Sequence, residues 1–444
     1  MPTKTILKQL LHVKNTVIEN FWLEKDSAEL DVLIIRVHPT KGHLHICPHC
    51  GKRMNGRYDS RCEYKRWRAM DLGSTKVFIE GPVERIYCPE HGVVTARVPW
   101  ARHDCLFSRE FENTVAWLAL HLTKSAVAEY MRISWNTVGP IISRVRKEED
   151  PHPEHRYDNL IRIGIDETSY KKGHKYLTVI VNHDNNSVCW VSDRHGKEVL
   201  TSFFEELTEE QRASIQLVSG DGAKWISECV SDFCPNAVRC IDFFHVVEWA
   251  GEALSEVRIE AWRQALKKSG QKRKRGRPKK GEEKAVDIAS EIKGSTYTLG
   301  KAPENLTENQ NTKLQMIAIS EPKLYRAYLI KEELRLLLKE DMSTIEGSLK
   351  KWLWWASHSQ IPAIYELQKK IRRHRTAILA TAEHRLSNAR VEATNNKIKV
   401  MIRMAYGFRN IQNLIDLILM KCSDIKHELP FRRFDYSLDF THTS

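Results

Sequence analysis

The stretch Ile161-Arg-Ile-Gly-Ile-Asp-Glu-Thr-Ser-Tyr170 decides the predicted fold of this chain. Its apolar residues alternate at positions 161, 163 and 165, which is typical of a strand with one buried face. Two runs rich in β-branched and aromatic residues follow at 175–182 and 188–191, and the polar segment between them predicts a turn. The sequence therefore predicts a three-stranded meander that presents Asp166, and a carboxylate held there is well placed to bind a metal ion.

Two more acidic residues are placed to join Asp166. Asp221 follows a predicted strand, within Ser219-Gly-Asp-Gly222, where we expect the glycines to let the backbone turn sharply. Glu392 lies in Asn388-Ala-Arg-Val-Glu-Ala-Thr-Asn-Asn-Lys-Ile-Lys399, which predicts a helix. Nothing local joins the three acids, so their grouping is a hypothesis about the fold.

Three motifs in the chain resemble the DDE transposases of bacterial insertion sequences, and specifically the ISL-three family. They are Ile163-Gly-Ile-Asp-Glu167, Ser219-Gly-Asp221, and the helix around Glu392 followed by Ala405-Tyr-Gly-Phe-Arg-Asn410. The family usually has Gly where this chain has Ala393, which is a change between small residues. The resemblance covers nearly the whole chain and implies a DNA transposase that binds terminal inverted repeats and inserts them into target DNA.

The chemistry that the resemblance implies is metal-dependent DNA cleavage and strand transfer. Carboxylates close together repel one another, and two Mg²⁺ ions about 4 Å apart, with Mn²⁺ as a substitute, would relieve this repulsion. Asp166 would bridge both ions, and Asp221 and Glu392 would bind one each. The segment Asp242-Phe-Phe-His245 resembles the Asp-x-x-His signature of transposases with a helical insertion. We expect Asp242 and His245 to have a supporting role.

Two other functions fit a chain of this kind. The first is a catalytically silent repressor derived from a transposase, against which the intact Asp166, Asp221 and Glu392 argue. The second is a ribonuclease H-like nuclease, which would nick any duplex without needing repeat ends.

A pair of short cysteine motifs predicts a structural zinc site. Cys47-Pro-His-Cys50-Gly51 and Cys88-Pro-Glu-His91-Gly92 each place two ligand residues three apart, with a glycine after them. Brought together by a β-hairpin, they give a closed tetrahedral Cys3His site for Zn²⁺. The alternative is four ordinary side chains, but paired motifs of this spacing favour zinc.

Two segments near the N-terminus are candidates for DNA contact. Residues 57–68 interleave cations with aromatic side chains, and either DNA binding or a solvated basic face explains them equally well. Residues 109–146 predict three helices, with Ser134 as the N-cap of the third. This pattern predicts a helix-turn-helix whose third helix enters a major groove. A plain three-helix unit has the same pattern. The DNA-binding candidates in these segments are Arg57, Arg61, Arg66, Trp135, Asn136 and Thr137.

The later part of the chain supplies further candidates for DNA contact. The basic segment Lys272-Arg-Lys-Arg-Gly-Arg-Pro-Lys-Lys280 resembles an AT-hook, in which Arg275 and Arg277 would lie along a minor groove. A basic linker that touches only phosphates is the alternative, and we favour non-specific contact. On the helix of Glu392, we expect Asn396 and Lys399 to contact the phosphate backbone. Trp352, Trp354 and Trp355 cluster on another helix, where core packing is favoured over base stacking.

These predictions combine into four parts. We expect an N-terminal zinc-binding domain at 1–105, a helix-turn-helix domain at 106–150 and an all-α insertion at 246–385. The remaining segments, 151–245 and 386–424, would form an α/β ribonuclease H-like catalytic domain, as the predicted order of strands and helices over 158–245 indicates. A homodimer or larger assembly on double-stranded DNA is expected, because two transposon ends must be brought together.

Composition agrees with a DNA partner. The chain has 444 residues and a formal net charge of +13, which favours a polyanion. Its ten cysteines are irregularly spaced, unlike a secreted disulfide framework, so we expect reduced thiols. The sequence shows no signal peptide and no apolar run long enough to span a bilayer. We therefore expect a cytoplasmic bacterial protein that is nucleoid-associated when bound.

Overall fold

The computed structural model describes residues 3–173, 175–269, 288–386 and 389–427. The chain divides into two compact units, one formed by Met1–Pro153 with Val400–Ser444 and the other by Glu154–Lys399. The expected catalytic segment 386–424 is thus shared between the units, since its residues from Val400 onward group with the N-terminal part. The AT-hook-like segment 272–280, with Arg275 and Arg277, lies outside the described residues.

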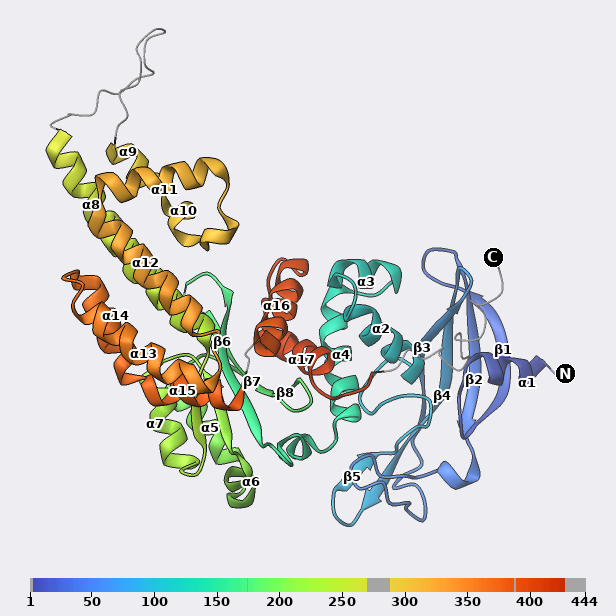
Figure 1. Cartoon of the computed structure of the whole chain (residues 1–444). Coiled ribbons are helices and arrows are strands. Elements are labelled where there is room, and N and C mark those ends of the chain that lie inside the picture. Colours follow the sequence, from blue (N-terminus) through green and yellow to red (C-terminus); the bar gives the residue numbers. More distant parts are fainter. Residues whose placement is uncertain (1–2, 174, 270–287, 387–388, 428–444) are drawn as a thin grey trace, which may run out of the picture. The chain divides into compact units, whose positions relative to one another are not determined.

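The first unit contains a five-stranded sheet in the order β1-β2-β4-β3, with β5 paired to β4 (Figure 1). Strands β2 and β4 are parallel, and the other pairs are antiparallel. The sequence favours two short strands within 75–87, but pairing with β3 and then with β5 makes one long strand, β4. The elements are α1 (Thr3–Leu10), β1 (Thr16–Lys25), β2 (Asp31–Pro39), β3 (Cys62–Leu72), β4 (Thr75–Cys88) and β5 (Gly92–Thr95).

Four helices complete the first unit: α2 (Arg109–Ala119), α3 (Lys124–Tyr130), α4 (Trp135–Glu149) and α17 (Ile411–Cys422). As predicted, Ser134 caps α4, because its side chain accepts a hydrogen bond from the Asn136 amide at 3.3 Å. Pro140 lies inside α4 without moving its start. Helix α17 packs on this trio, with Met420 buried in their shared core.

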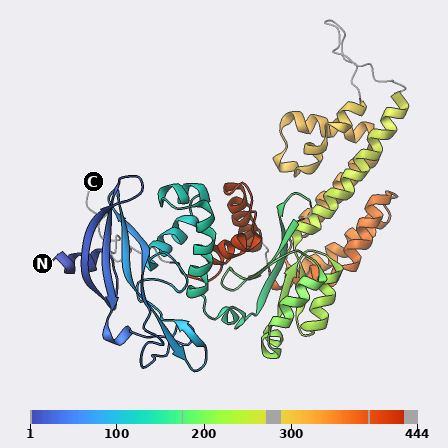
Figure 2. The same cartoon turned by 180° about the vertical axis from the view of Figure 1, so that it is seen from behind.

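The second unit is built on a five-stranded sheet in the order β10-β9-β6-β7-β8, seen from both sides in Figures 1 and 2. Strands β6, β9 and β10 are parallel, whereas β7 is antiparallel to both β6 and β8. The predicted meander is therefore present, with β6 at the centre of the sheet. The strands are β6 (Arg162–Lys171), β7 (Lys175–Asn182), β8 (Ser187–Asp193), β9 (Leu217–Gly220) and β10 (Val238–Ile241).

Helices α5 (Lys197–Glu206), α6 (Glu209–Ser214) and α7 (Lys224–Phe233) belong to the same unit. A fully buried cluster that includes Ile163, Ile165 and Phe203 joins the sheet to α5 and α7. The short α6 is fixed by a capping box between Thr208 and Gln211. Apolar alternation on β6 thus produces the buried face that positions Asp166.

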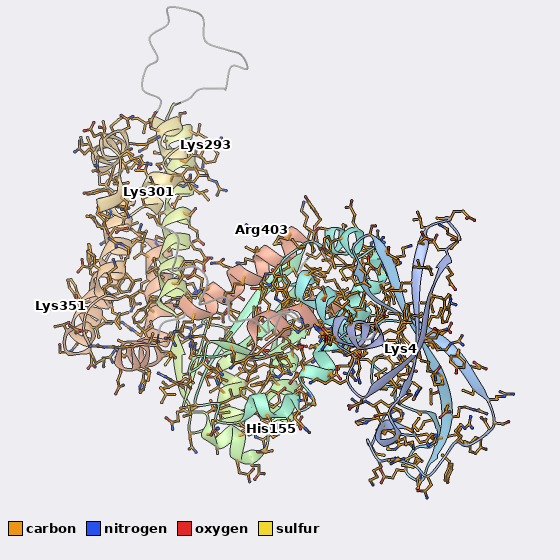
Figure 3. All side chains as sticks on the ribbon, turned by 90° about the vertical axis from the view of Figure 1, so that its right-hand side faces the viewer. Lys4, His155, Lys293, Lys301, Lys351 and Arg403 are labelled. Carbon is orange, nitrogen blue, oxygen red and sulfur yellow. The ribbon has the colours of Figure 1, made fainter. Side chains whose placement is uncertain are left out.

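Between β10 and α16 (Ala389–Met404), the described residues form helices and short turns but no strand. Helices α8 and α12 lie side by side (Figures 1 and 2). Lys293 and Lys301 lie toward the end of this region that is remote from the sheet (Figure 3). The longer helices are α8 (Phe243–Ser269), α11 (Glu308–Ser320), α12 (Pro322–Leu337), α13 (Met342–Ser357), α14 (Pro362–Arg373) and α15 (Arg375–His384), and the short ones are α9 (Ile288–Lys293) and α10 (Thr296–Gly300).

The tryptophans of α13 differ in environment. Trp352 is 1% exposed, and its Nε1 donates a hydrogen bond to the Ile330 carbonyl at 2.8 Å, as core packing requires. Trp354 is 64% exposed and stacks on His358. No helix in the described part of the chain is both long enough and apolar enough to cross a membrane.

Candidate catalytic and metal-binding sites

Three aspartates lie in register across neighbouring parallel strands, with Asp166 in the middle of β6 and Asp221 and Asp242 directly after β9 and β10. Gly164 on β6 pairs with Ser219 on β9, and Ile241 on β10 pairs with Gly220 on β9. Continuing each register forward brings Asp166 beside Asp221 and Asp221 beside Asp242. Asp242, for which we expect a supporting role, therefore lies in the same row as the two predicted metal ligands.

The electrostatics of Asp166 reflect this grouping. Burial raises the pKa of its carboxyl above the ordinary value, and the nearby Asp221 and Asp242 raise it further. A hydrogen bond from the Glu167 amide, at 2.7 Å, and the imidazole of His245 act in the opposite direction. A raised carboxyl pKa means that ionised Asp166 is destabilised here, and a bound cation would relieve this.

The glycines on either side of Asp221 have a different purpose from the one expected. Neither has a positive φ, so they do not serve a sharp left-handed turn. Instead, a Cβ atom on Gly222 would lie 2.3 Å from Cζ2 of Trp249, and one on Gly220 would lie 3.0 Å from the Ile165 carbonyl oxygen. Close packing on both sides therefore fixes the backbone that carries Asp221, whose Oδ1 accepts a hydrogen bond from the Ala223 amide at 2.9 Å.

Helix α16 approaches β6 through its buried face. Val391 lies so near Gly164 that a Cβ there would be 2.6 Å from its Cγ2. One turn further on, the amide group of Asn395 donates a hydrogen bond to Asp166 Oδ2. Glu392 belongs to the same helix but is exposed to solvent. Asn396 and Lys399 are exposed as well, as a contact with DNA would require.

The ligand oxygens of Asp166, Asp221 and Glu392, all of which are described, do not all lie within 4.8 Å of one another. Two buried oxygens, Glu167 Oε1 and Asn395 Oδ1, have no hydrogen-bond partner among the residues that the structure describes. The Oε2 atom of Glu167 also lies 3.5 Å from Nδ1 of His195. Carboxylate and amide oxygens are the donors that Mg²⁺ prefers, so the residue types suit this ion.

The four predicted zinc ligands come together. Cys50 Sγ lies 3.7 Å from Cys88 Sγ, and His91 Nδ1 lies 3.5 Å from Cys88 Sγ and 3.8 Å from Cys47 Sγ. Tetrahedral zinc with its usual bond lengths separates ligand atoms by about 3.5–3.8 Å. Cys47, Cys50, Cys88 and His91 form a metal-sized group of ligand atoms.

Both glycines after these motifs adopt the left-handed conformation, with φ of +70° at Gly51 and +68° at Gly92. Other residues rarely adopt this conformation, so the two tight turns depend on glycine. Burial alone would raise the pKa of the Cys47 thiol, but hydrogen bonds from the Cys50 and His49 amides bring it below its usual value. The turn therefore favours a thiolate, which is the form that binds metal.

The first turn of α4 is open to solvent. Trp135 and Asn136 are exposed, Thr137 is half-buried, and the Lys124 ammonium lies 3.6 Å from the Trp135 ring centroid. Lys124, Trp135 and Asn136, but not Thr137, line a groove of about 570 Å³ whose other side includes residues 404–410. The family motif at 405–410, expected with the catalytic domain, thus lies beside the helix-turn-helix.

The basic segment 57–68 is largely paired within the protein. Arg66 bonds to Glu24 and Glu80, and Arg57 lies 3.6 Å from Glu84. Arg61 is exposed, and its side chain forms no ion pair among the described residues. Of the three arginines proposed for DNA contact, Arg61 is the one that has no carboxylate within 4.0 Å among the described residues, although it lowers the pKa of Asp59 through its charge.

Comparison with known proteins agrees with this architecture. Residues 163–418 match a DDE model of the ISL3 family that is described as a transposase, and residues 96–146 match the helix-turn-helix domain of transposase family ISL3. The chain is 42% identical over 433 residues to the transposase for insertion sequence element IS1557 of Mycobacterium tuberculosis, covering 96% of this chain and 97% of that protein. It is 25% identical over 381 residues to the transposase for insertion sequence element IS1001 of Bordetella parapertussis, covering 85% and 88%.

The matches over both the α/β unit and the three-helix segment define a DNA transposase with a helix-turn-helix domain. The chain belongs to the ISL3 family of transposases. This confirms the resemblance drawn from the sequence motifs and confirms the helix-turn-helix prediction.

Proposed function

We propose that this transposase cleaves and joins DNA at a metal site formed by Asp166, Asp221 and Glu392. The observation that carries the proposal is the convergence of three segments: Asp166 and Asp221 follow one register on adjacent strands, and Asn395, one turn after Glu392, bonds to Asp166. Asp242 and His245 support the site through their charges on Asp166.

Each residue has a definite part in the proposed chemistry. When bound, two Mg²⁺ ions, or Mn²⁺ in their place, would lower the pKa of a water molecule and stabilise the charge on the leaving oxygen. Asp166 lies between Asp221 and α16, so it is the residue suited to serve both ions. Asp221 is held by a closely packed backbone, and the exposed carboxylate of Glu392 would complete the set of ligands. Asn395 orients the Asp166 carboxylate.

The strand order supports a ribonuclease H-like catalytic domain. If β6 to β10 are numbered 1 to 5, their order across the sheet is 3-2-1-4-5. Strands 3, 2 and 1 pair antiparallel, whereas strands 1, 4 and 5 pair parallel. We propose that the helices between β10 and α16 are an all-α insertion into this domain.

The Cys3His group is proposed to bind one structural Zn²⁺ in the N-terminal unit. Its ligand separations suit tetrahedral zinc, and four protein ligands leave no open position for catalysis. The helix-turn-helix is proposed to bind the terminal inverted repeats through the first turn of α4. Since two ends must be joined, the active form would be at least a dimer on DNA.

Excision of a marker flanked by the element's own ends tests this function. The test compares the wild type with Asp166→Asn, which keeps the side-chain shape and removes the charge that binds metal. Excision by the wild type alone is expected. Equal excision by both would place the active site elsewhere, and equal end binding without any excision would indicate a repressor.

A further inference from the structure

The helical region of the second unit reaches the backbone next to Asp221. A Cβ atom on Gly222 would lie 2.3 Å from Cζ2 of Trp249 on α8 and 3.6 Å from Nε2 of His374, at the end of α14. Only a glycine fits at this distance. Side chains from two helices therefore form one wall of the space beside the proposed metal ligand.

Two basic side chains gather on Trp249. The Lys370 ammonium lies 4.0 Å from the centroid of its indole, and the His374 ring lies 5.4 Å from it, inclined by 40°. Residues four apart lie on the same side of a helix, so α14 presents Lys370 and His374 together. The cation–π contact and the ring packing hold both groups in place.

In the described part of the chain, neither basic group has a partner at hydrogen-bond or ion-pair distance, and the carboxylates of Glu252, Asp221 and Glu248 act on Lys370 only from further away. Among the described residues, no carboxylate lies within 4.0 Å of the Lys370 ammonium, and no hydrogen bond is formed by the His374 ring. Both side chains are half-buried, and burial lowers the pKa of each. Partly desolvated donors without partners are unfavourable, and an anionic ligand would satisfy them.

We propose that Lys370 and His374 bind one backbone phosphate of the DNA beside Asp221, and that Trp249 is the positioning residue that holds them. This inference rests on the proposed function, since it assigns a role in substrate binding to the helical region. An ammonium and an imidazole N–H both donate to phosphate oxygens. A stacked base is a poorer fit, because the indole already contacts Gly222, Lys370 and His374.

The test uses the full-length protein and a duplex that carries the element's ends. Lys370→Gln keeps much of the stem but removes the charge, and it is expected to reduce Mg²⁺-dependent cleavage by about 10- to 100-fold. Lys370→Arg should restore most of the activity. Lys369→Gln is the matched control, because the adjacent Lys369 is exposed and already bonds to Glu366 at 2.9 Å. Equal melting temperatures would show that the variants remain folded.

A second measurement identifies the ligand. The phosphates near the cleavage site are replaced one at a time with neutral methylphosphonate. At one position, this replacement should lower cleavage by the wild type but should not lower the already reduced cleavage by Lys370→Gln. His374→Gln should be insensitive at the same position. Wild-type activity in Lys370→Gln, or unchanged sensitivity at every position, would overturn the inference.

Cleavage by the wild type but not by Asp221→Asn establishes the proposed catalytic site independently of Lys370. If that pair behaves as expected while Lys370→Gln matches the wild type, only the phosphate site is wrong. If the wild type does not cleave the ends, the proposed function fails and the inference fails with it.

Discussion

Asn395 donates a hydrogen bond to Asp166 Oδ2 from a position 229 residues further along the chain. The bond joins α16 to the central strand β6, and Val391 fits against Gly164 on the same face. Because Glu392 lies one turn before Asn395, this contact sets where Glu392 stands relative to Asp166. The placement of the third carboxylate therefore depends on an amide that is not itself acidic.

Asn395→Asp should make this dependence visible. A second carboxylate beside Asp166 would repel it, and we expect a loss of about 1–3 kcal/mol in the free energy of unfolding without metal. Added Mg²⁺ or Mn²⁺ should recover much of the loss, which thermal unfolding with and without metal would measure. Asn396→Asp, at an exposed position on the same helix, is the control. Equal effects of the two substitutions would contradict the assigned contact.

Gly222→Ala tests the close packing beside Asp221. The new methyl group would meet Trp249 at 2.3 Å, and such overpacking destabilises by about 1–3 kcal/mol. Gly251→Ala on α8 has no atom within 4 Å of its new Cβ and should be neutral or stabilising. Chemical denaturation compares the two, and a smaller side chain at Trp249 should rescue Gly222→Ala. Equal stability of both glycine variants would show that the loop is not fixed by Trp249.

Zinc content tests the Cys3His site. The wild type should contain one zinc per chain, and Cys88→Ser should lose it together with the stability of the N-terminal unit, because metal binding is coupled to folding. Cys62→Ser is the matched control, since Cys62 is exposed and outside the ligand group. Metal analysis after dialysis measures the zinc content of each protein. Retention of zinc by Cys88→Ser would exclude the proposed ligand set.

His183 predicts a pH dependence of stability. Burial lowers its pKa from 6.5 to about 4, and its Nε2 lies 2.7 Å from Ser219 Oγ. In the unfolded chain, His183 is no longer buried and regains its ordinary pKa. Between about pH 6.5 and 4, the unfolded chain therefore binds a proton that the folded chain does not. Stability is therefore complete above pH 6.5 and falls by up to about 3 kcal/mol as the pH drops to 4.

His183→Gln keeps a hydrogen-bonding group without a titrating one, so it should flatten the stability profile in this range of pH. Urea unfolding of both proteins at pH 7.5 and 5 measures the difference. His358→Gln is the comparison, because the His358 side chain is exposed to solvent. Parallel profiles for the wild type and His183→Gln would show that another group is responsible.

Local patterns predicted much of the fold. Alternation at Ile163 and Ile165 identified β6, and Ser134 marked the start of α4, because these signals depend on neighbours in sequence. The grouping of Cys47, Cys50, Cys88 and His91 was predictable for the same reason, since each of the two motifs carries two of these residues and its own turn. In these cases the local preference and the final structure agree.

Long-range packing accounts for what the sequence did not reveal. Asp242 comes beside Asp221 only through the pairing of β10 with β9. Position 222 requires a glycine because the indole of Trp249, which belongs to a different segment, leaves no room for a Cβ atom. Helix α17 groups with the helix-turn-helix because Asp416, fully buried, pairs with Arg146 at 2.8 Å. No spacing within the chain predicts such contacts.

Binding of a catalytic metal ion by Asp166, which we propose, can be tested through a change of metal preference. Asp166→Cys places a thiolate at this position, and Mn²⁺ accepts sulfur ligands more readily than Mg²⁺. With DNA carrying the element's ends, the variant should be inactive in Mg²⁺ and regain cleavage in Mn²⁺, whereas the wild type should be active in both. Full activity of Asp166→Cys in Mg²⁺ would contradict the account.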